Sequence, residues 1–218
     1  EVGSVRGTKS FAAELIELHE SPREVPPFSE RFPVLTPEAG YRAARHLHAH
    51  RLAQGWRPRG RKIGFTNRTL WPRYGVFEPM WGTVYEQTLV FAQDNRARVP
   101  LAGLTQPRIE PEIAFRLKAS PPRTRDPDRL LEAIECIMHS VEIVQCHHPE
   151  WKVTLADCCA DNGLHGRLIV GTPIKVHRAM EAALEHYDLG GVSGHFHDTY
   201  GQALSNTLAC LQMGVWQF

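Results

Sequence analysis

The sequence lacks any hydrophobic run long enough to cross a membrane. Although 42% of its 218 residues are hydrophobic, no stretch approaches the ~20 consecutive apolar residues that a transmembrane helix needs. No secretory signal peptide is visible in the sequence either. We therefore expect a cytoplasmic protein that has no membrane partner.

Cysteine motifs are absent as well. The number of cysteines is odd, and no pair has the C-x-x-C spacing of a zinc or redox site. Reduced thiols in a cytoplasm are the simplest interpretation. The five cysteines are Cys136, Cys146, Cys158, Cys159 and Cys210.

The chain has almost no net charge, because 25 basic side chains oppose 24 acidic ones. Proteins that bind nucleic acid through its phosphates carry a basic surface, so we expect no nucleic-acid partner. The charged fraction of 22% is ordinary for a globular protein. The length allows one large domain or two small ones, each with a core.

Helices are expected at the N-terminal end. Apolar residues within 1–20 have loosely helical spacing, and four prolines make 21–34 an irregular connection. Thr36-Pro37 is a strong helix start, and the helix is predicted to run to about Gln54. His46 and His50 share a face of this helix, either as a metal pair or, as the lack of a partner carboxylate favours, as polar surface.

Strands and helices are expected to alternate further along the chain. Residues 60–67 read as a strand leading into a loop. The aromatic-rich stretch 71–85 is predicted to be a loop, which either walls a pocket or forms a core patch. A second helix is predicted from Asp126 through Met138. Short strands should follow at 140–145 and 168–171.

Two glutamates stand on one face of a predicted strand at 107–117. In a strand with a period of two, Glu110 and Glu112 point to the same side. Such carboxylates repel each other unless a cation or a shared proton lies between them, and Mg²⁺ or Mn²⁺ suits oxygen ligands. The alternative is an exposed strand face with two solvated glutamates. Pro111 restricts the strand to an edge or a bulge.

Three further segments carry candidate site residues. Lys62 lies beside glycines, which allow the backbone to come close to a ligand. The alternative is a surface lysine within a run of basic residues. Glu142 interrupts an apolar strand, so it should be exposed, paired or metal-bound. Asp161 and Asn162 precede Gly163 in a loop that either hydrogen-bonds a ligand or forms a turn.

Several stretches together resemble one known family, the 2-keto-4-pentenoate hydratase / 4-oxalocrotonate decarboxylase branch of the fumarylacetoacetate hydrolase superfamily. The resemblance covers roughly residues 36–173. The stretches are 60–67 (GRKIGFTN), 79–82 (PMWG), 106–114 (QPRIEPEIA), 140–144 (SVEIV) and 160–162 (ADN).

This resemblance implies a fold, a metal and a reaction. The implied fold is α/β (α+β), a mixed β-roll with an N-terminal helical region, truncated at its C-terminal end. A divalent metal, Mg²⁺ or Mn²⁺, would bind Glu110, Glu112 and Glu142. The family's active-site lysine corresponds to Lys62. Where the family often has acids in the loop near 77–81, this sequence has only Glu78.

The implied substrate is a 2-keto (2-hydroxydienoic) acid such as 2-keto-4-pentenoate, from aromatic catabolism. Its carboxylate and keto oxygen chelate the metal, which acts as a Lewis acid, while Lys62 moves a proton. The reaction is either hydration or decarboxylation. A homo-oligomer or a complex with a homologous subunit is expected, because related enzymes associate.

Residues 177–218 carry a second resemblance, to a fragment of the hydroxymethylglutaryl-CoA lyase family. There, His195 and His197 match a metal-binding His-x-His pair; they either bind metal or belong to a vestigial tail. We therefore expect three segments, an N-terminal helical region (1–56), a hydratase-like core (57–175) and a lyase-like fragment (176–218). The alternatives to a keto-acid lyase are acyl-CoA lyase chemistry and a non-catalytic remnant or subunit partner.

Overall fold

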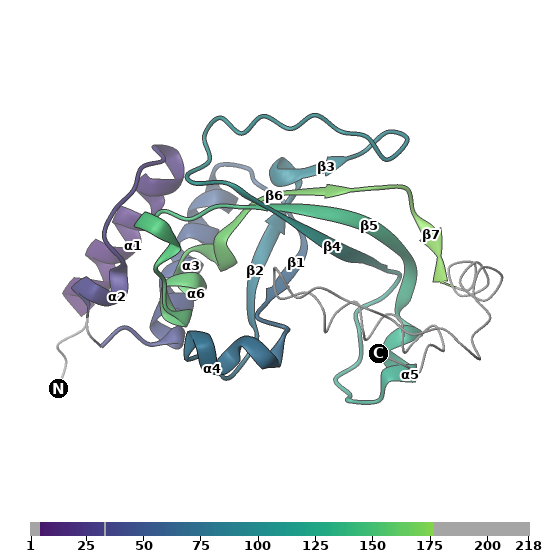
Figure 1. The fold of residues 1–218 in the computed structure, drawn as a ribbon, viewed down its shortest axis with the longest axis horizontal. Helices are drawn as coiled ribbons and strands as arrows, with labels where there is room; N and C mark the ends of the chain where they lie inside the picture. Colours follow the sequence, from purple (N-terminus) through teal and green to yellow (C-terminus); the bar gives the residue numbers. More distant parts are fainter. Residues whose placement is uncertain (1–4, 33, 177–218) are drawn as a thin grey trace. The chain divides into compact units, whose positions relative to one another are not determined.

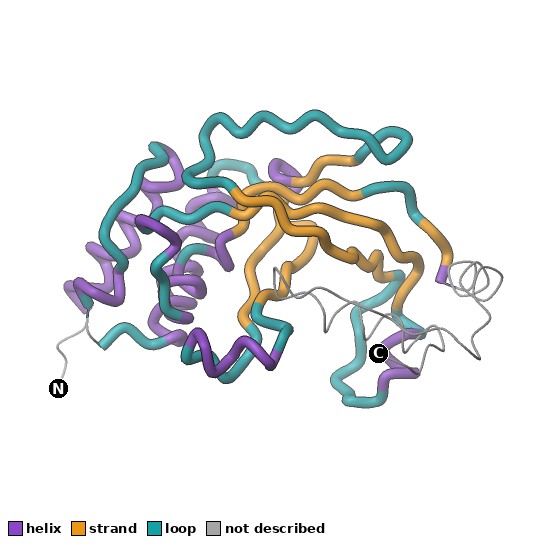
Figure 2. Tube along the Cα trace, viewed as in Figure 1, coloured by secondary structure: helices purple, strands orange, loops and turns teal. Residues whose placement is uncertain are grey.

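The computed structural model describes residues 5–32 and 34–176. Its elements are of both types, which confirms the mixed α/β fold (Figures 1 and 2). The helices are α1 (Val5–Glu20), α2 (Phe28–Arg31), α3 (Pro37–Ala53), α4 (Trp71–Tyr74), α5 (Pro127–Leu131) and α6 (Leu155–Ala160). The strands are β1 (Pro58–Gly64), β2 (Met80–Tyr85), β3 (Leu89–Phe91), β4 (Arg108–Leu117), β5 (Ile134–Val144), β6 (His165–Val170) and β7 (Ile174–Lys175). Single 3₁₀ turns are η1 (Arg68–Leu70), η2 (Glu86–Thr88), η3 (Pro149–Trp151) and η4 (Asn162–Leu164).

The chain forms two compact units. Of the described residues, the first comprises 5–32, 34–89, 99–110 and 142–168, and the second comprises 90–98, 111–141 and 169–176. Strands β4 and β5 each contribute residues to both. The first unit contains residues on both sides of the expected boundary at 56/57, so the predicted three-segment division stays a prediction.

In the first unit, helices α1, α2, α3 and α6 pack together around a hydrophobic core (Figure 1). Helix α1 buries Phe11, Leu15 and Leu18, which share one face because of their spacing. The predicted helix start is confirmed, since the Thr36 hydroxyl accepts a hydrogen bond from the Ala39 amide at 3.3 Å. The core residues are Phe11, Ala12, Leu15, Leu18, Phe28, Ala43, Leu47 and Ala160.

The same unit contains an antiparallel hairpin of β1 and β2, in which Lys62 lies opposite Gly82. The prediction of a loop over 71–85 was therefore wrong. Met80, Gly82 and Val84 are buried on alternate positions of β2, which is the period of a half-buried strand. Trp81, an exposed aromatic residue between Met80 and Gly82, obscured that alternation.

The second unit contains most of β4 and β5, and β7 pairs antiparallel with β5. The predicted helix through Met138 was wrong, because α5 ends at Leu131 and β5 begins at Ile134. Cys136 and Met138 are buried on alternate positions, and β-branched residues favour a strand here. The hydrogen-bonded strand order is β3-β6-β5-β4, with β7 beside β5 (Figure 2).

Within the described residues, no helix combines the length and the apolar character needed to span a membrane.

Candidate active site

Three acidic side chains predicted as metal ligands come together in the structure. Glu110 and Glu112 lie two residues apart on β4, and Glu142 lies near the end of β5. One carboxylate oxygen of each lies within 4.8 Å of the others. Glu142 is almost completely buried, with 2% of its surface exposed, and the other two are half-buried. Their role as ligands stays a prediction.

Lys62 points into the same group of acids. Its Nζ lies 3.1 Å from Glu142 Oε2 and donates a hydrogen bond to the Gly163 carbonyl at 2.9 Å. Only 9% of the Lys62 side chain is exposed, whereas the Arg57 side chain is 72% exposed and that of Arg59 53%. The interpretation of Lys62 as one more surface cation of the basic run was therefore wrong.

Two glycines allow the backbone to approach Lys62. A Cβ on Gly82 would lie 2.1 Å from the Asn162 carbonyl oxygen, so only glycine lets β2 pass so close to η4. Gly163 has a φ of +67°, and a Cβ there would lie 2.9 Å from Lys62 Cδ. Its neighbours Asn162 and Leu164 also have positive φ, of 49° and 60°. This left-handed turn aims the Gly163 carbonyl at the lysine.

The side chains of Asp161 and Asn162, predicted to bind the substrate, form hydrogen bonds with other residues of the protein. The Asn162 side chain accepts a hydrogen bond from the Thr83 amide at 2.8 Å and donates one to the Thr83 carbonyl at 3.0 Å. The two carboxylate oxygens of Asp161 contact His19 and His147, each at 2.7 Å. These contacts hold the turn in place, and substrate binding by Asp161 and Asn162 stays a prediction.

His165 is a site residue that the sequence reasoning missed. Its Nδ1 lies 2.7 Å from Glu142 Oε1, and its Nε2 lies 2.8 Å from the Thr88 hydroxyl. Burial lowers the pKa of His165, which therefore stays neutral at neutral pH. A signal for it exists in the sequence, because His165 comes two residues after the Asp-Asn-Gly loop, where the chain enters a strand.

Burial and neighbouring charges shift the pKa values of two of the acids, Glu110 and Glu142. Burial raises the pKa of Glu110; the positive charge of Lys62 opposes this shift, and the negative charge of Glu142 adds to it. Burial acts in the same direction on Glu142, but Lys62 and the hydrogen bond from His165 outweigh it and lower the pKa of that carboxyl. A raised pKa means that another positive charge nearby would stabilise the ionised form of Glu110. The carboxylate oxygens of the three glutamates therefore fit a hard divalent cation.

Comparison with known proteins places this geometry in context. No protein-family model matches the chain. It is 32% identical over 160 residues to the 2-hydroxyhexa-2,4-dienoate hydratase of Comamonas testosteroni, a match that covers 72% of this chain and 60% of the relative. Over 166 residues it is 29% identical to a 2-keto-4-pentenoate hydratase of Paraburkholderia xenovorans (75% and 60%). It is also 32% identical over 127 residues to a 4-oxalocrotonate decarboxylase of a Pseudomonas species (58% and 48%).

A solved structure of 4-oxalocrotonate decarboxylase from Pseudomonas putida G7, complexed with magnesium and adipate, matches with a TM-score of 0.73 and 21% identity. The match covers 87% of this chain and 68% of the other. The chain has the fold of 4-oxalocrotonate decarboxylase. The expectation drawn from the first resemblance is thereby confirmed for the fold. The chain spans only about half to three fifths of the length of the three relatives above.

The second resemblance, to hydroxymethylglutaryl-CoA lyase, receives no support from these comparisons. His195 and His197 lie outside the residues that the structure describes. Their binding of a metal therefore stays a prediction, as does a lyase-like segment at 176–218.

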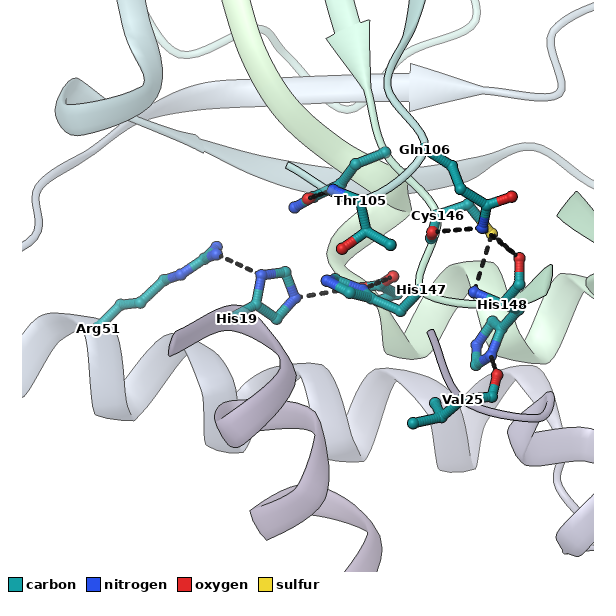
Figure 3. A network of polar contacts seen from close by, with 10 residues as sticks. His19, Val25, Arg51, Thr105, Gln106, Cys146, His147 and His148 are labelled. Carbon is teal, nitrogen blue, oxygen red and sulfur yellow. Dashed lines mark hydrogen bonds and ion pairs between the residues drawn. The ribbon is translucent and has the colours of Figure 1, made fainter. Parts of the chain in front are cut away.

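A second buried polar cluster is made by His19, His147 and Asp161, which form a group separate from the three glutamates. Figure 3 shows His19 and His147 together with Arg51. His19 Nε2 and His147 Nδ1 flank the Asp161 carboxylate, and an Arg51 N–H donates to His19 Nδ1 at 3.0 Å. Since Nδ1 of His19 accepts a hydrogen bond, its Nε2 carries the proton and has no lone pair for a metal. The cluster therefore acts as a hydrogen-bonded link between α1, α3 and the turn that begins at Asp161.

This link should make stability depend on pH. Burial lowers the pKa of His19 to about 4. As the pH falls from 6.5 to 4, the unfolded chain binds a proton at this position and the folded chain does not, so His19 destabilises the fold by roughly 3 kcal/mol at the acid end. The pKa of His147 is raised by contrast, so its contribution to the free energy of unfolding changes with pH only above 6.5. It therefore does not mask the loss due to His19.

His19→Gln tests that prediction. The glutamine amide can donate to Asp161 and accept from Arg51 without titrating. We expect urea unfolding of this variant to show a flatter dependence of the free energy on pH between 6.5 and 4 than the unmodified protein. His50→Gln, at a partly exposed histidine on α3, is the matched control. Equal slopes for His19→Gln and the unmodified protein would show that His19 is not the titrating group.

Proposed function

We propose that the chain carries a lyase site for 2-keto (2-hydroxydienoic) acids, acting as a hydratase or a decarboxylase with a bound Mg²⁺ or Mn²⁺. The observation that carries this proposal is the convergence of Glu110, Glu112 and Glu142 beside a buried lysine. The names of the similar proteins, hydratases and decarboxylases of such acids, support the substrate class. The solved neighbours complexed with magnesium or calcium support a divalent cation.

The three glutamates would hold the cation through carboxylate oxygens, the ligands that Mg²⁺ and Mn²⁺ prefer. When bound, the cation supplies Lewis-acid polarisation of the keto group of the substrate. Glu142 enters this arrangement ionised, because Lys62 and His165 favour its charged form. Its burial keeps water from competing for the same oxygens.

Lys62 is the proposed acid and base. Its Nζ is held on one side by Glu142 and on another by the Gly163 carbonyl, so the amine has a defined direction. A proton passes between Nζ and the reacting carbon of the substrate, which is general acid–base catalysis. In hydration, water adds to the far double bond; in decarboxylation, the bond to the carboxyl carbon breaks and CO₂ leaves. The described contacts serve either outcome.

The direct test is turnover by the 218-residue chain. We expect the ultraviolet absorbance of 2-hydroxypenta-2,4-dienoate to fall on hydration, or 4-oxalocrotonate to release CO₂. Removal of metal with EDTA should slow the reaction by at least about 10²-fold, since Lewis-acid stabilisation is worth several kcal/mol, and Mg²⁺ or Mn²⁺ should restore it. Turnover of either acid that EDTA leaves unchanged would contradict the metal requirement.

From the family resemblance of residues 36–173, we also propose that this chain acts as a homo-oligomer or with a homologous subunit. The same assay should therefore be run across protein concentrations and with an added homologous hydratase subunit. A chain that binds the subunit yet turns over neither acid, alone or in the complex, would be a non-catalytic partner instead.

A further inference from the structure

The two oxygens of the Glu142 carboxylate have different partners. Oε1 accepts a hydrogen bond from His165 Nδ1 at 2.7 Å, and Oε2 faces Lys62 Nζ at 3.1 Å. Both Glu142 and His165 are only 2% exposed. The carboxylate is therefore fixed in rotation about its last bond, with one oxygen committed to the histidine and the other turned toward the proposed site.

Glu142 determines which nitrogen of His165 carries the proton. An ionised carboxylate only accepts, so Nδ1 is the donor and Nε2 of the neutral ring is left as an acceptor. Thr88 Oγ1 lies 2.8 Å from this Nε2; it accepts from the Tyr85 amide at 3.2 Å and lies 3.0 Å from the Tyr85 carbonyl oxygen. Thr88 is itself buried at the end of η2, so the hydroxyl is held in position.

The backbone brings His165 to this place. It is the first residue of β6 and follows the left-handed turn of η4. The next residue, Gly166, passes so close to β5 that a Cβ there would lie 2.6 Å from the Ile143 carbonyl oxygen. Because the backbone of β6 lies so close to β5 here, His165 lies next to Glu142, the residue before Ile143.

We propose that His165, held by Thr88, is a positioning residue that fixes Glu142 for binding a divalent cation. The inference rests on the proposed metal site and adds to it a residue that touches neither the cation nor the substrate. Loss of a hydrogen-bonding partner of a metal ligand typically lowers metal affinity by about 10–100-fold. The effect should therefore appear in cation binding itself, in the absence of any reaction.

Two substitutions of the same chemical kind separate positioning from mere packing. In His165→Asn, the amide nitrogen takes the place of Nδ1 and can still donate to Glu142. In His165→Gln, the amide lies one bond further out, toward Thr88, and the donor to Glu142 is lost. Glutamine is closer to histidine in size, so a role in packing alone predicts that His165→Gln behaves at least as well as His165→Asn.

The measurement is isothermal titration calorimetry of the full chain with Mg²⁺, together with a melting temperature for each variant. We expect His165→Asn to bind Mg²⁺ within a few-fold of the unmodified protein and His165→Gln to bind about 10–100-fold more weakly. His50→Gln, far from the acids in sequence and partly exposed, is the control and should bind as the unmodified protein does.

The outcomes are distinguishable. Equal affinities of His165→Asn and His165→Gln, in a protein that binds Mg²⁺, would overturn the role of His165 and leave the metal site standing. An unmodified protein that binds no Mg²⁺ would overturn both. If His165→Gln does not fold, Thr88→Val replaces it, because it keeps the histidine and removes the partner of Nε2; it should weaken binding several-fold, and unchanged binding would overturn the proposal.

Discussion

Lys62→Met is expected to lower turnover of the 2-keto acid by about 10²–10⁴-fold, the usual contribution of a positioned acid or base. Methionine has nearly the same length as lysine but no amine, so the proton at the reacting carbon loses its donor and acceptor. Steady-state kinetics with saturating Mg²⁺ measures the loss, which should fall on kcat more than on KM.

Two controls belong to this prediction. Lys62→Arg keeps a positive charge beside Glu142 but cannot give up its proton at neutral pH, so it should be as inactive as Lys62→Met while losing less stability. Lys152→Met applies the same change to a lysine whose side chain is 69% exposed, and its activity should be unchanged. An active Lys62→Met variant would remove Lys62 from the proton-transfer role.

Glu142→Ala is expected to abolish metal-dependent turnover and also to lower the free energy of unfolding by about 3–5 kcal/mol. Removing one partner of a buried ion pair leaves the other charge without compensation, and here Lys62 and the donor of His165 both lose Glu142. Chemical denaturation and the turnover assay measure the two effects separately.

Glu142→Gln separates charge from structure. The amide keeps the size of the side chain and an oxygen for His165, so the variant should lose less stability than Glu142→Ala, although Lys62 still loses its negative partner. It should bind Mg²⁺ poorly. Glu135→Gln, on the same strand, changes an acid whose ion pair with Arg116 is half-exposed; such pairs contribute about 0–1 kcal/mol, and turnover should persist. Full turnover by Glu142→Gln would rule out Glu142 as a necessary ligand.

Much of the proposed site could be predicted from sequence because strand geometry is local. Glu110 and Glu112 share a face of β4 on the period of two alone. Lys62 was harder, since its neighbours are exposed arginines. Its burial depends on the Gly163 carbonyl, 101 residues away in the chain, and on the missing Cβ of Gly82. Contacts of that kind arise only when β2 and η4 pack, which no local pattern encodes.

The wrong predictions have the same physical origin. Residues 134–138 fit a helix by spacing, but their burial against the sheet selects β5, because tertiary packing overrides propensity. Asp161 was expected either to hydrogen-bond a ligand or to lie in a turn, and substrate binding stays a prediction. Its contacts with His19 and His147 could not be foreseen, because these two residues are separated from each other by most of the described chain. His165 escaped notice because its partner, Glu142, lies on another strand.

The most direct test of three carboxylates sharing one cation is a crystal of the protein grown with Mn²⁺ and oxalate, a planar mimic of the reacting keto acid. Anomalous scattering locates the metal without reference to any assumed site. We predict one Mn²⁺ peak with oxygens of Glu110, Glu112 and Glu142 at about 2.0–2.4 Å, a distance typical of hard cations, and oxalate on its open side. A metal bound elsewhere, or these three side chains turned apart with no peak among them, would contradict the account.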